Sequence, residues 1–303
     1  MSETGPPLAL SIVVPVYNEE GNVEPLHDEL TRVVRELGRP YELVFVNDGS
    51  RDGTLARLSA LRARDEHLRI VDLDGNFGEA AALSAGFAHA RGALVVTLDG
   101  DGQNDPADIP RLLARLGPEL DVVSGRRRER QEAFLSRVLP SRIANWLIAR
   151  ATGVPVHDTG CGLKVYRRAV VAGAQLPRGM NRFLPAVLGV RPARVAEEWV
   201  NDRRRGSGRS HYGLARIFAV LRDLPAVPIL VRLPRGRPAV GRALGGAPVV
   251  LVGVVLVLIL GGLGWPANPA PAVGAALGWA VAHGVGRWVR AQEHGVFRVR
   301  RIL

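Results

Sequence analysis

The most informative part of this chain is Ala93-Leu94-Val95-Val96-Thr97-Leu98-Asp99-Gly100-Asp101-Gly102-Gln103, where an apolar run passes directly into a polar loop. The apolar run predicts a buried strand. The loop carries two carboxylates and one amide at alternate positions. Mg²⁺ and Mn²⁺ take oxygen ligands, usually one or two carboxylates completed by substrate phosphates. The loop therefore predicts a cation site, although glycines and aspartates of this kind also form ordinary turns.

Apolar runs and amphipathic segments alternate on both sides of this loop. The pattern predicts strands at residues 8–14, 41–46, 68–73, 93–98 and 121–123. It predicts helices between them, at residues 20–37, 52–64, 79–90 and 106–116. Short apolar strands that alternate with helices indicate an α/β fold, with a mostly parallel sheet covered by helices on both faces.

Three of the predicted strands run straight into polar loops, at residues 15–20, 47–50 and 99–103. Ligands of parallel sheets bind beyond the carboxyl ends of the strands, so we expect these loops to share one site. The sequence has no Gly-x-x-x-x-Gly-Lys-Ser/Thr loop and no Gly-x-Gly-x-x-Gly after its first strand. Bound nucleotide phosphates would therefore have to be held by a metal ion and by arginine.

Charge is distributed unevenly along the chain. Residues 1–120 carry 20 acidic and 11 basic side chains, whereas residues 121–303 carry 9 acidic and 29 basic ones, within a total net charge of +11. An acidic half suits a cation, and a basic half suits phosphate groups or an anionic membrane surface. The single cysteine, Cys161, excludes an intrachain disulfide and a cysteine-based zinc site.

The last third of the sequence changes character. Residues 249–264 form an uncharged apolar run and residues 269–285 a second uncharged segment, so residues 247–289 are expected to hold two membrane-spanning helices. Arginines flank the pair on both sides, which predicts a helical hairpin with both flanks in the cytoplasm. Residues 213–246 read as an amphipathic juxtamembrane segment and residues 290–303 as a basic cytoplasmic tail. The alternative is a helical hairpin buried inside a soluble protein.

Four motifs occur in order and carry a family resemblance: Val14-Pro15-Val16-Tyr17-Asn18-Glu19-Glu20, Val46-Asn47-Asp48-Gly49-Ser50, Asn76-Phe77-Gly78 and Leu98-Asp99-Gly100-Asp101-Gly102-Gln103. Together they resemble the family 2 glycosyltransferases of the GT-A fold. More narrowly, they are similar to the polyprenyl-phosphate glycosyltransferases, which include dolichol-phosphate mannose synthases and bacterial undecaprenyl-phosphate glycosyltransferases. The resemblance implies a catalytic domain over residues 1–212, with a nucleotide-sugar half (1–125) and an acceptor half (126–212).

The resemblance also implies roles for individual residues. The nucleotide-sugar would be bound by Pro15, Tyr17, Glu19, Asp48, Asp99, Arg205 and Ser207. The cofactor, Mg²⁺ or Mn²⁺, would be held by Asp101 and Gln103. The lipid phosphate would be gripped by Arg126, Arg137 and Ser141. The catalytic set would be Asp99, Asp101, Asp158 and Arg205, with Arg203 and Arg204 as competitors for the place of Arg205.

The function implied by the resemblance is inverting, metal-dependent transfer of a sugar from a UDP- or GDP-sugar to a polyprenyl phosphate. The protein would be a multi-pass protein of the inner membrane with its catalytic domain in the cytoplasm, and the lipid bilayer would be a partner. One alternative is a family 2 enzyme with a hydroxyl acceptor, which would need Asp158 as a base. The other is a non-enzymatic basic protein that binds membranes or nucleic acid, although no DNA-binding motif is present. The sequence leaves open the sugar, the nucleotide, the metal and whether the chain forms a homo-oligomer.

Overall fold

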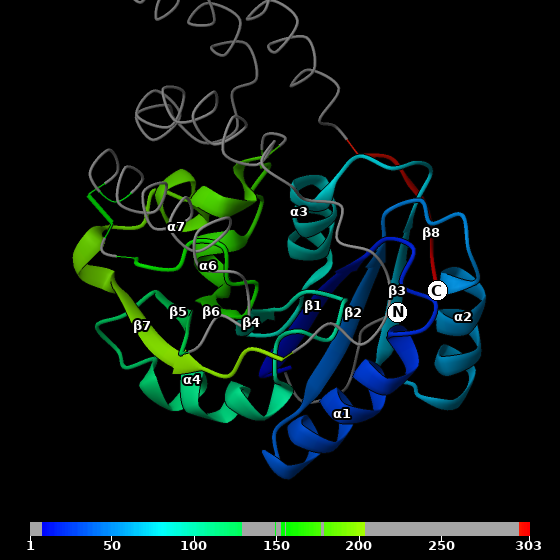
Figure 1. Cartoon of the computed structure of the whole chain (residues 1–303), viewed down its shortest axis with the longest axis horizontal. Coiled ribbons are helices and arrows are strands. Elements are labelled where there is room, and N and C mark those ends of the chain that lie inside the picture. Colours follow the sequence, from blue (N-terminus) through cyan, green and yellow to red (C-terminus); the bar gives the residue numbers. More distant parts are fainter. Residues whose placement is uncertain (1–7, 129–148, 150–152, 155, 177–178, 204–296) are drawn as a thin grey trace, which may run out of the picture. The chain divides into compact units, whose positions relative to one another are not determined.

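The computed structural model describes residues 8–128, 149, 153–154, 156–176, 179–203 and 297–303. The chain divides into two compact units, residues 1–231 with 297–303, and residues 232–296. All of the described residues belong to the first unit, in which helices pack around one sheet (Figure 1).

The described strands form one sheet of eight, in the order β7-β5-β6-β4-β1-β2-β3-β8. Their bounds are β1 Leu10–Val16, β2 Tyr41–Asn47, β3 Leu68–Leu73, β4 Leu94–Thr97, β5 Val122–Arg127, β6 Lys164–Arg167, β7 Val195–Val200 and β8 Val299–Ile302. The pairs β1–β2, β1–β4, β2–β3 and β5–β7 are parallel. β6 runs antiparallel between β4 and β5, and β8 runs antiparallel to β3. The predicted mostly parallel sheet is confirmed.

Helices cover both faces of this sheet. The described helices are α1 Val23–Glu36, α2 Thr54–Arg64, α3 Glu79–His89, α4 Ile109–Arg115, α6 Arg168–Val171 and α7 Leu184–Val187, with 3-10 turns at η1 Pro106–Asp108, η3 Met180–Phe183 and η4 Pro192–Arg194. Ile12 and Val14 of β1 belong to the apolar core that also contains side chains of α1, α2 and α4. Val13, which points to the opposite face, packs against Gly86 of α3. The four long helices predicted from the sequence are thus present and lie on two sides.

Two features of the described residues differ from the prediction or add to it. α1 begins at Val23 and not at Glu20, because residues 17–22 form a loop at the end of β1. β8, in the segment expected to be only a basic tail, pairs with β3. The predicted juxtamembrane segment and both predicted membrane spans lie outside the described residues. Within the described part of the chain, no helix is both long and apolar enough to cross a membrane.

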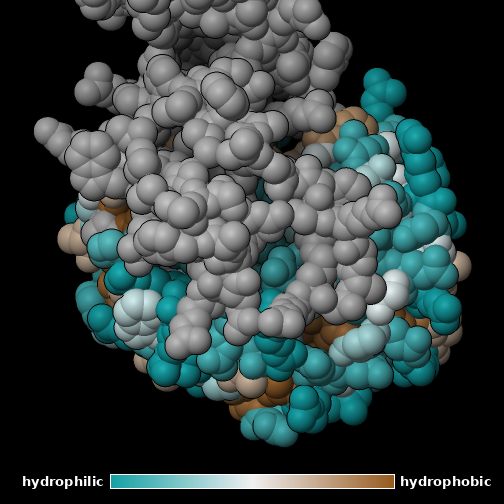
Figure 2. All heavy atoms as spheres, viewed as in Figure 1, coloured by the Kyte–Doolittle hydropathy of each residue, from teal (hydrophilic) through white to brown (hydrophobic). Residues whose placement is uncertain are grey.

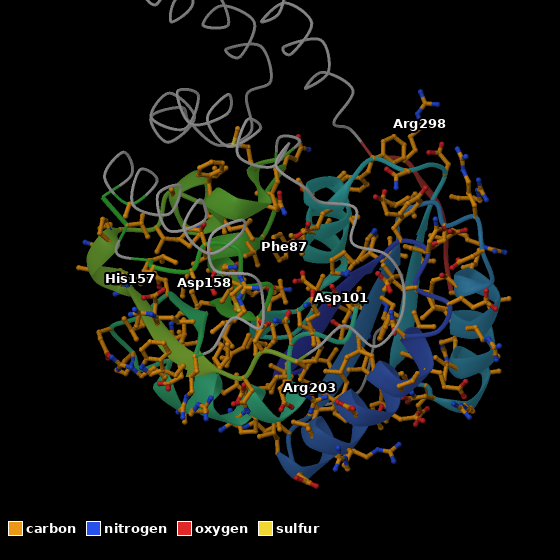
Figure 3. All side chains as sticks on the ribbon, in the orientation of Figure 1. Phe87, Asp101, His157, Asp158, Arg203 and Arg298 are labelled. Atoms are coloured by element: carbon orange, nitrogen blue, oxygen red, sulfur yellow. The ribbon has the colours of Figure 1, made fainter. Side chains whose placement is uncertain are left out.

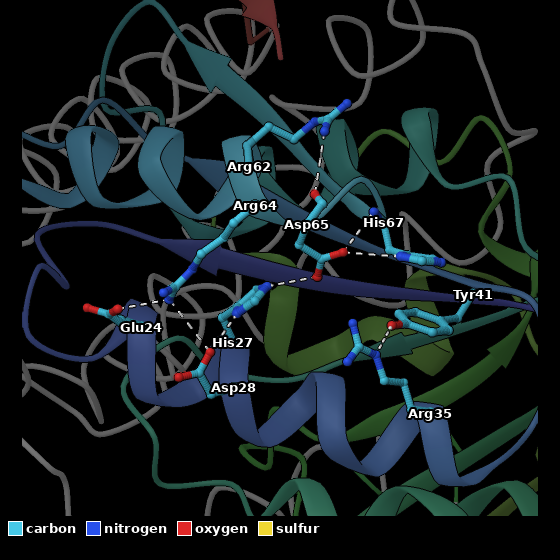
Figure 4. Close-up of polar contacts among 9 residues, drawn as sticks. All are labelled: Glu24, His27, Asp28, Arg35, Tyr41, Arg62, Arg64, Asp65 and His67. Carbon is cyan, nitrogen blue, oxygen red and sulfur yellow. Dashed lines mark hydrogen bonds and ion pairs between the residues drawn. The ribbon is translucent and has the colours of Figure 1, made fainter.

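Away from the strand ends, Asp65 joins α1 to the loop before β3 (Figure 4). Its carboxylate lies 2.9 Å from Nε2 of His27 and 3.1 Å from Nδ1 of His67, and it accepts the backbone N–H of His67. Burial acts to raise the pKa of Asp65, but these hydrogen bonds outweigh it and hold the pKa below its ordinary value. The described surface in Figure 2 is mainly hydrophilic, with scattered apolar side chains.

Candidate active site

The carboxyl ends of the parallel strands place the predicted site residues at one edge of the sheet. β1, β2 and β4 end there, and so does β5, because β4 and β5 both run antiparallel to β6. The loop that precedes β6 reaches the same edge and contains Asp158. Figure 3 shows Asp101, Asp158 and Arg203 on the loops around this edge. The sequence prediction that the polar loops share one edge is confirmed.

Hydrogen bonds link the loops after β1 and β2, where the nucleotide is expected. Asn18 adopts a left-handed conformation with φ of 55°, and its side-chain oxygen accepts the N–H of Arg51 at 2.8 Å. The backbone N–H of Asn18 donates to Oγ of Ser50, and that of Glu19 donates to Oγ1 of Thr54, both at 2.9 Å. Pro15, Tyr17 and Glu19 are partly exposed beside these contacts. The loops after β1 and β2 are therefore joined by several hydrogen bonds.

Asp48 connects the loop after β2 to the start of α3. It is 3% exposed, and its two carboxylate oxygens accept the backbone N–H groups of Phe77 and Gly78 at 2.7 and 2.8 Å. Gly78 is the N-cap of α3, so the carboxylate satisfies donors at the start of that helix. Direct contact of Asp48 with a nucleotide stays a prediction, whereas its role in joining the loop after β2 to α3 is visible.

The loop after β4 holds the proposed cation ligands. Asp101 is 7% exposed, and its Oδ1 accepts the N–H of Gln103 at 3.0 Å, which closes a tight turn. The N–H of Asp99 donates to Oδ1 of Asn104 at 3.1 Å. Among the described residues, no set of three or more His, Cys, Asp or Glu side chains surrounds a metal position. A cation on Asp101 and Gln103 would thus rely on further oxygens from a bound substrate.

Negative charge is concentrated around Asp99. Burial, followed by repulsion from Glu79 and Asp101, raises the pKa of Asp99 to about 7, against the opposing charges of Lys164 and Arg127. A group of carboxylates that repel one another in this way is an environment that a divalent cation would stabilise. Gly162 allows the loop before β6 to approach, because a Cβ at this position would lie 2.3 Å from Oδ1 of Asp99.

Asp158 lies in the loop before β6 and is engaged by Arg127 of β5. It is 4% exposed, and Arg127 donates from Nε at 2.7 Å and from Nη2 at 3.0 Å to its two oxygens. Burial alone would lower the pKa of Arg127, but Asp158 and Asp202 raise it above its ordinary value. Asp158 is therefore bound to the guanidinium in the two-point geometry that arginine and carboxylate favour.

Arg126 and Arg127 point to opposite faces of β5, since neighbouring residues of a strand alternate. The guanidinium of Arg126 lies over the ring of Trp199, 4.3 Å from its centroid, and its Nη1 is 3.9 Å from Glu197. The side chain of Arg126 is 37% exposed. Arg127 and Trp199 were not among the predicted site residues; the alternation of side chains along residues 122–127 indicates only that Arg126 and Arg127 lie on opposite faces.

Lys164, the single lysine of the chain, was also not among the predicted site residues. It is 2% exposed at the start of β6, and its Nζ donates to the carbonyl oxygen of Cys161. Thr97 of β4 donates from Oγ1 to the carbonyl oxygen of Gly162 at 2.8 Å. The loop before β6 is thus held to β4 and β6. Burial, followed by Asp158, raises the pKa of Cys161 to about 12, which keeps this thiol protonated.

Arg203 is paired with two carboxylates. Its guanidinium contacts Glu29 at 2.7 Å and Asp105 at 2.6 Å, and its backbone N–H donates to the carbonyl of Gln103. This arrangement leaves Arg204 and Arg205 as the candidates for diphosphate binding. Both lie outside the described residues, as do three other predicted site residues, Arg137, Ser141 and Ser207. Their roles stay predictions.

Residues 11–173 match the glycosyl transferase family 2 domain. The chain is 39% identical over 282 residues to dodecaprenyl-phosphate galacturonate synthase of Rhizobium johnstonii, a match that covers 83% of each chain. It is 40% identical over 216 residues to undecaprenyl-phosphate 4-deoxy-4-formamido-L-arabinose transferase of Pseudomonas aeruginosa, which covers 71% of this chain and 63% of the relative.

A solved structure of glucosyl-3-phosphoglycerate synthase from Mycobacterium tuberculosis, in complex with Mn²⁺, UDP and glucosyl-3-phosphoglycerate, has a similar fold. Its TM-score is 0.56 at 22% identity, covering 75% of this chain and 81% of that one. The likeness shows the fold, and the expected GT-A-like α/β architecture is confirmed. The chain is a glycosyltransferase that belongs to family 2, and its relatives are polyprenyl-phosphate glycosyltransferases.

Proposed function

We propose that this enzyme transfers one sugar from a nucleotide-sugar to a polyprenyl phosphate, with inversion at the anomeric carbon. The relatives named above act with dodecaprenyl or undecaprenyl phosphate, which supports this acceptor class. The observation that carries the proposal is the bidentate pair between Arg127 and Asp158. A hydroxyl acceptor needs a base to remove its proton, and the carboxylate expected to act as that base is already bound on both oxygens.

A phosphate acceptor needs no such base. The second pKa of a phosphate monoester is about 6, so its attacking oxygen is already anionic near neutral pH. The site must instead bring two anions together and stabilise the departing diphosphate. Arg126, half-exposed at the end of β5, would bind the acceptor phosphate through its planar set of donors. Arg204 or Arg205 would take the donor diphosphate, since Arg203 is paired with Glu29 and Asp105.

Mg²⁺ or Mn²⁺ fits the loop after β4. Asp101 and Gln103 supply a carboxylate and an amide oxygen on one turn, and the repulsion around Asp99 marks excess negative charge beside them. When bound, the cation would neutralise diphosphate charge as the leaving group departs. The Mycobacterium tuberculosis structure with Mn²⁺ and UDP supports the same class of cofactor and donor.

The pairing of β8 with β3 supports the proposed membrane topology. β7 and β8 belong to one sheet, yet residues 204–296 lie between Arg203 and the described C-terminal segment. A segment that leaves and rejoins the same folded unit crosses a bilayer an even number of times. The two apolar segments at residues 247–289 satisfy that condition, with both flanks on the cytoplasmic side of the inner membrane.

The test is an assay on detergent-purified protein with Mg²⁺ or Mn²⁺ and undecaprenyl phosphate. The donors are UDP- and GDP-sugars, including nucleotide-linked galacturonate and 4-deoxy-4-formamido-L-arabinose. We expect a glycolipid product and nucleoside diphosphate release with one donor, both lost with EDTA and in Asp101→Ala. Product on a hydroxyl acceptor but none on polyprenyl phosphate would overturn the proposed acceptor. Absence of nucleotide binding would overturn the proposal as a whole.

A further inference from the structure

β8 attaches the C-terminal segment to the strand that leads into the nucleotide side of the site. Ile70 and Leu303 exchange two backbone hydrogen bonds of 3.0 Å, and Asp74 donates its N–H to the carbonyl of Arg298 at 3.0 Å. In register, Asp72 lies opposite Arg301. The strand thereby occupies the edge of β3 immediately before the loop that leads to α3.

The guanidinium of Arg301 forms an ion pair with the buried carboxylate of Asp72. Asp72 is 1% exposed, and its Oδ2 lies 3.3 Å from Nε of Arg301. Its Oδ1 accepts a hydrogen bond of 2.8 Å from Nδ2 of Asn47. Burial of a carboxylate to this degree is costly unless a charged partner and hydrogen-bond donors surround it. Arg301 and Asn47 together meet that requirement, one on each oxygen.

Asn47 is the first residue of the loop predicted to contact the nucleotide. Its side-chain oxygen accepts the N–H of Ser50 at 3.2 Å, so the orientation of the amide group shapes residues 47–50. Gly49 has φ of +66° and packs so closely on Gly75 that a Cβ would lie 2.4 Å from the carbonyl carbon of Gly75. The loop therefore has little room to adopt another shape once Asn47 is oriented by Asp72.

We propose that Arg301 is a positioning residue for the nucleotide-binding loop at residues 47–50, acting through Asp72 and Asn47. The C-terminal strand, which follows the predicted membrane segments, thereby contributes to affinity for the nucleotide-sugar donor. Arg301 itself does not touch the substrate. The inference rests on the proposed function, because it assumes that the loop binds the donor.

The test compares Arg301→Gln, Arg301→Lys and Arg298→Gln in the full chain purified in detergent. The measurements are the Kd of UDP and GDP, the KM for the donor, the KM for undecaprenyl phosphate, kcat and the thermal unfolding midpoint. Arg298→Gln is the matched control, because it removes the same charge from the same segment while its side chain points away from the sheet (Figure 3).

We expect Arg301→Gln to raise nucleotide Kd and donor KM about five- to tenfold, since a half-exposed guanidinium contributes less than a fully buried one. The acceptor KM should remain near that of the wild type, Arg301→Lys should recover most of the donor affinity, and Arg298→Gln should change neither constant. An unchanged donor KM in Arg301→Gln would overturn the inference. So would an equal effect of Arg298→Gln, or a fall in stability with donor and acceptor KM affected alike. Failure of the wild type to bind either nucleotide would instead overturn the proposed function, and this inference with it.

Discussion

Asp158→Asn separates a structural ion-pair role of this residue from a role as a catalytic base. The substitution replaces the carboxylate bound to Arg127 at 2.7 and 3.0 Å with a neutral amide, and Asp202, 3.8 Å from Nη1, stays as the charged partner of this guanidinium. Removing one partner of a buried pair typically costs about 3–5 kcal/mol. Asparagine retains one oxygen, so we expect a loss of about 3 kcal/mol in the free energy of unfolding. For a domain of this size, that corresponds to a fall of about 6–12 °C in the unfolding midpoint.

A double-mutant cycle supplies the control for this prediction. If Asp158 acts through Arg127, then Arg127→Met should destabilise the protein to a similar extent. The double variant Arg127→Met with Asp158→Asn should lose less than the two single variants combined, because it removes both members of the Arg127–Asp158 pair. Thermal unfolding and transfer to undecaprenyl phosphate are measured on all four proteins.

The opposite pattern would refute the ion-pair role. An Asp158→Asn protein with an unchanged unfolding midpoint and a hundredfold lower kcat would identify the carboxylate as a base. Loss of the acidic limb of the pH–rate profile in that variant would support the same conclusion. A hydroxyl acceptor would then become the better interpretation of the site.

Three further predictions concern other parts of the domain. Arg126→Ala should raise the KM for undecaprenyl phosphate at least about tenfold, and a normal acceptor KM would contradict this. The same substitution should lower the free energy of unfolding by less than about 1 kcal/mol, since the guanidinium packs on the exposed Trp199. Gly162→Ala should lower kcat, because the new Cβ would displace Asp99. An unaltered kcat would contradict this, since it would show that the loop before β6 moves without disturbing the site. The pKa of Asp65 is lower in the folded protein than the ordinary carboxyl value of about 4. The ionised carboxylate therefore stabilises the fold at a pH above that value, and this stabilisation is lost as the pH falls through the lower pKa of the folded state. Acid unfolding of Asp65→Asn should accordingly depend less on pH in this range, and an identical profile would exclude this cause.

The local pattern of the sequence was sufficient for most of the sheet. The five predicted strands at residues 8–14, 41–46, 68–73, 93–98 and 121–123 all occur, within a few residues of their predicted limits. Their apolar runs are continuous because both faces of the sheet are covered. β8 could not be predicted in the same way. Val299–Ile302 contains two arginines in four residues and exposes most of its side chains, so no apolar run marks it as a strand.

Part of the candidate site could likewise be predicted from the sequence, and part could not. The order of motifs predicted the family, and the ends of β1, β2 and β4 predicted that their polar loops would meet. The sequence could not say which of the adjacent residues Arg126 and Arg127 would engage Asp158, because that depends on the face each side chain takes and on a partner 31 residues away.

The sequence by itself determined the α/β class, the family and the loops that carry oxygen and nitrogen ligands, because these follow from hydrophobic periodicity and short motifs. Only the tertiary structure decided which charges are paired: Asp158 with Arg127, Arg203 with Glu29 and Asp105, and Asp72 with Arg301. The physical reason is that a charge removed from water must be matched by a partner nearby in space. That partner is set by the packing of strands and loops, and its distance along the chain ranges from 31 residues to 229.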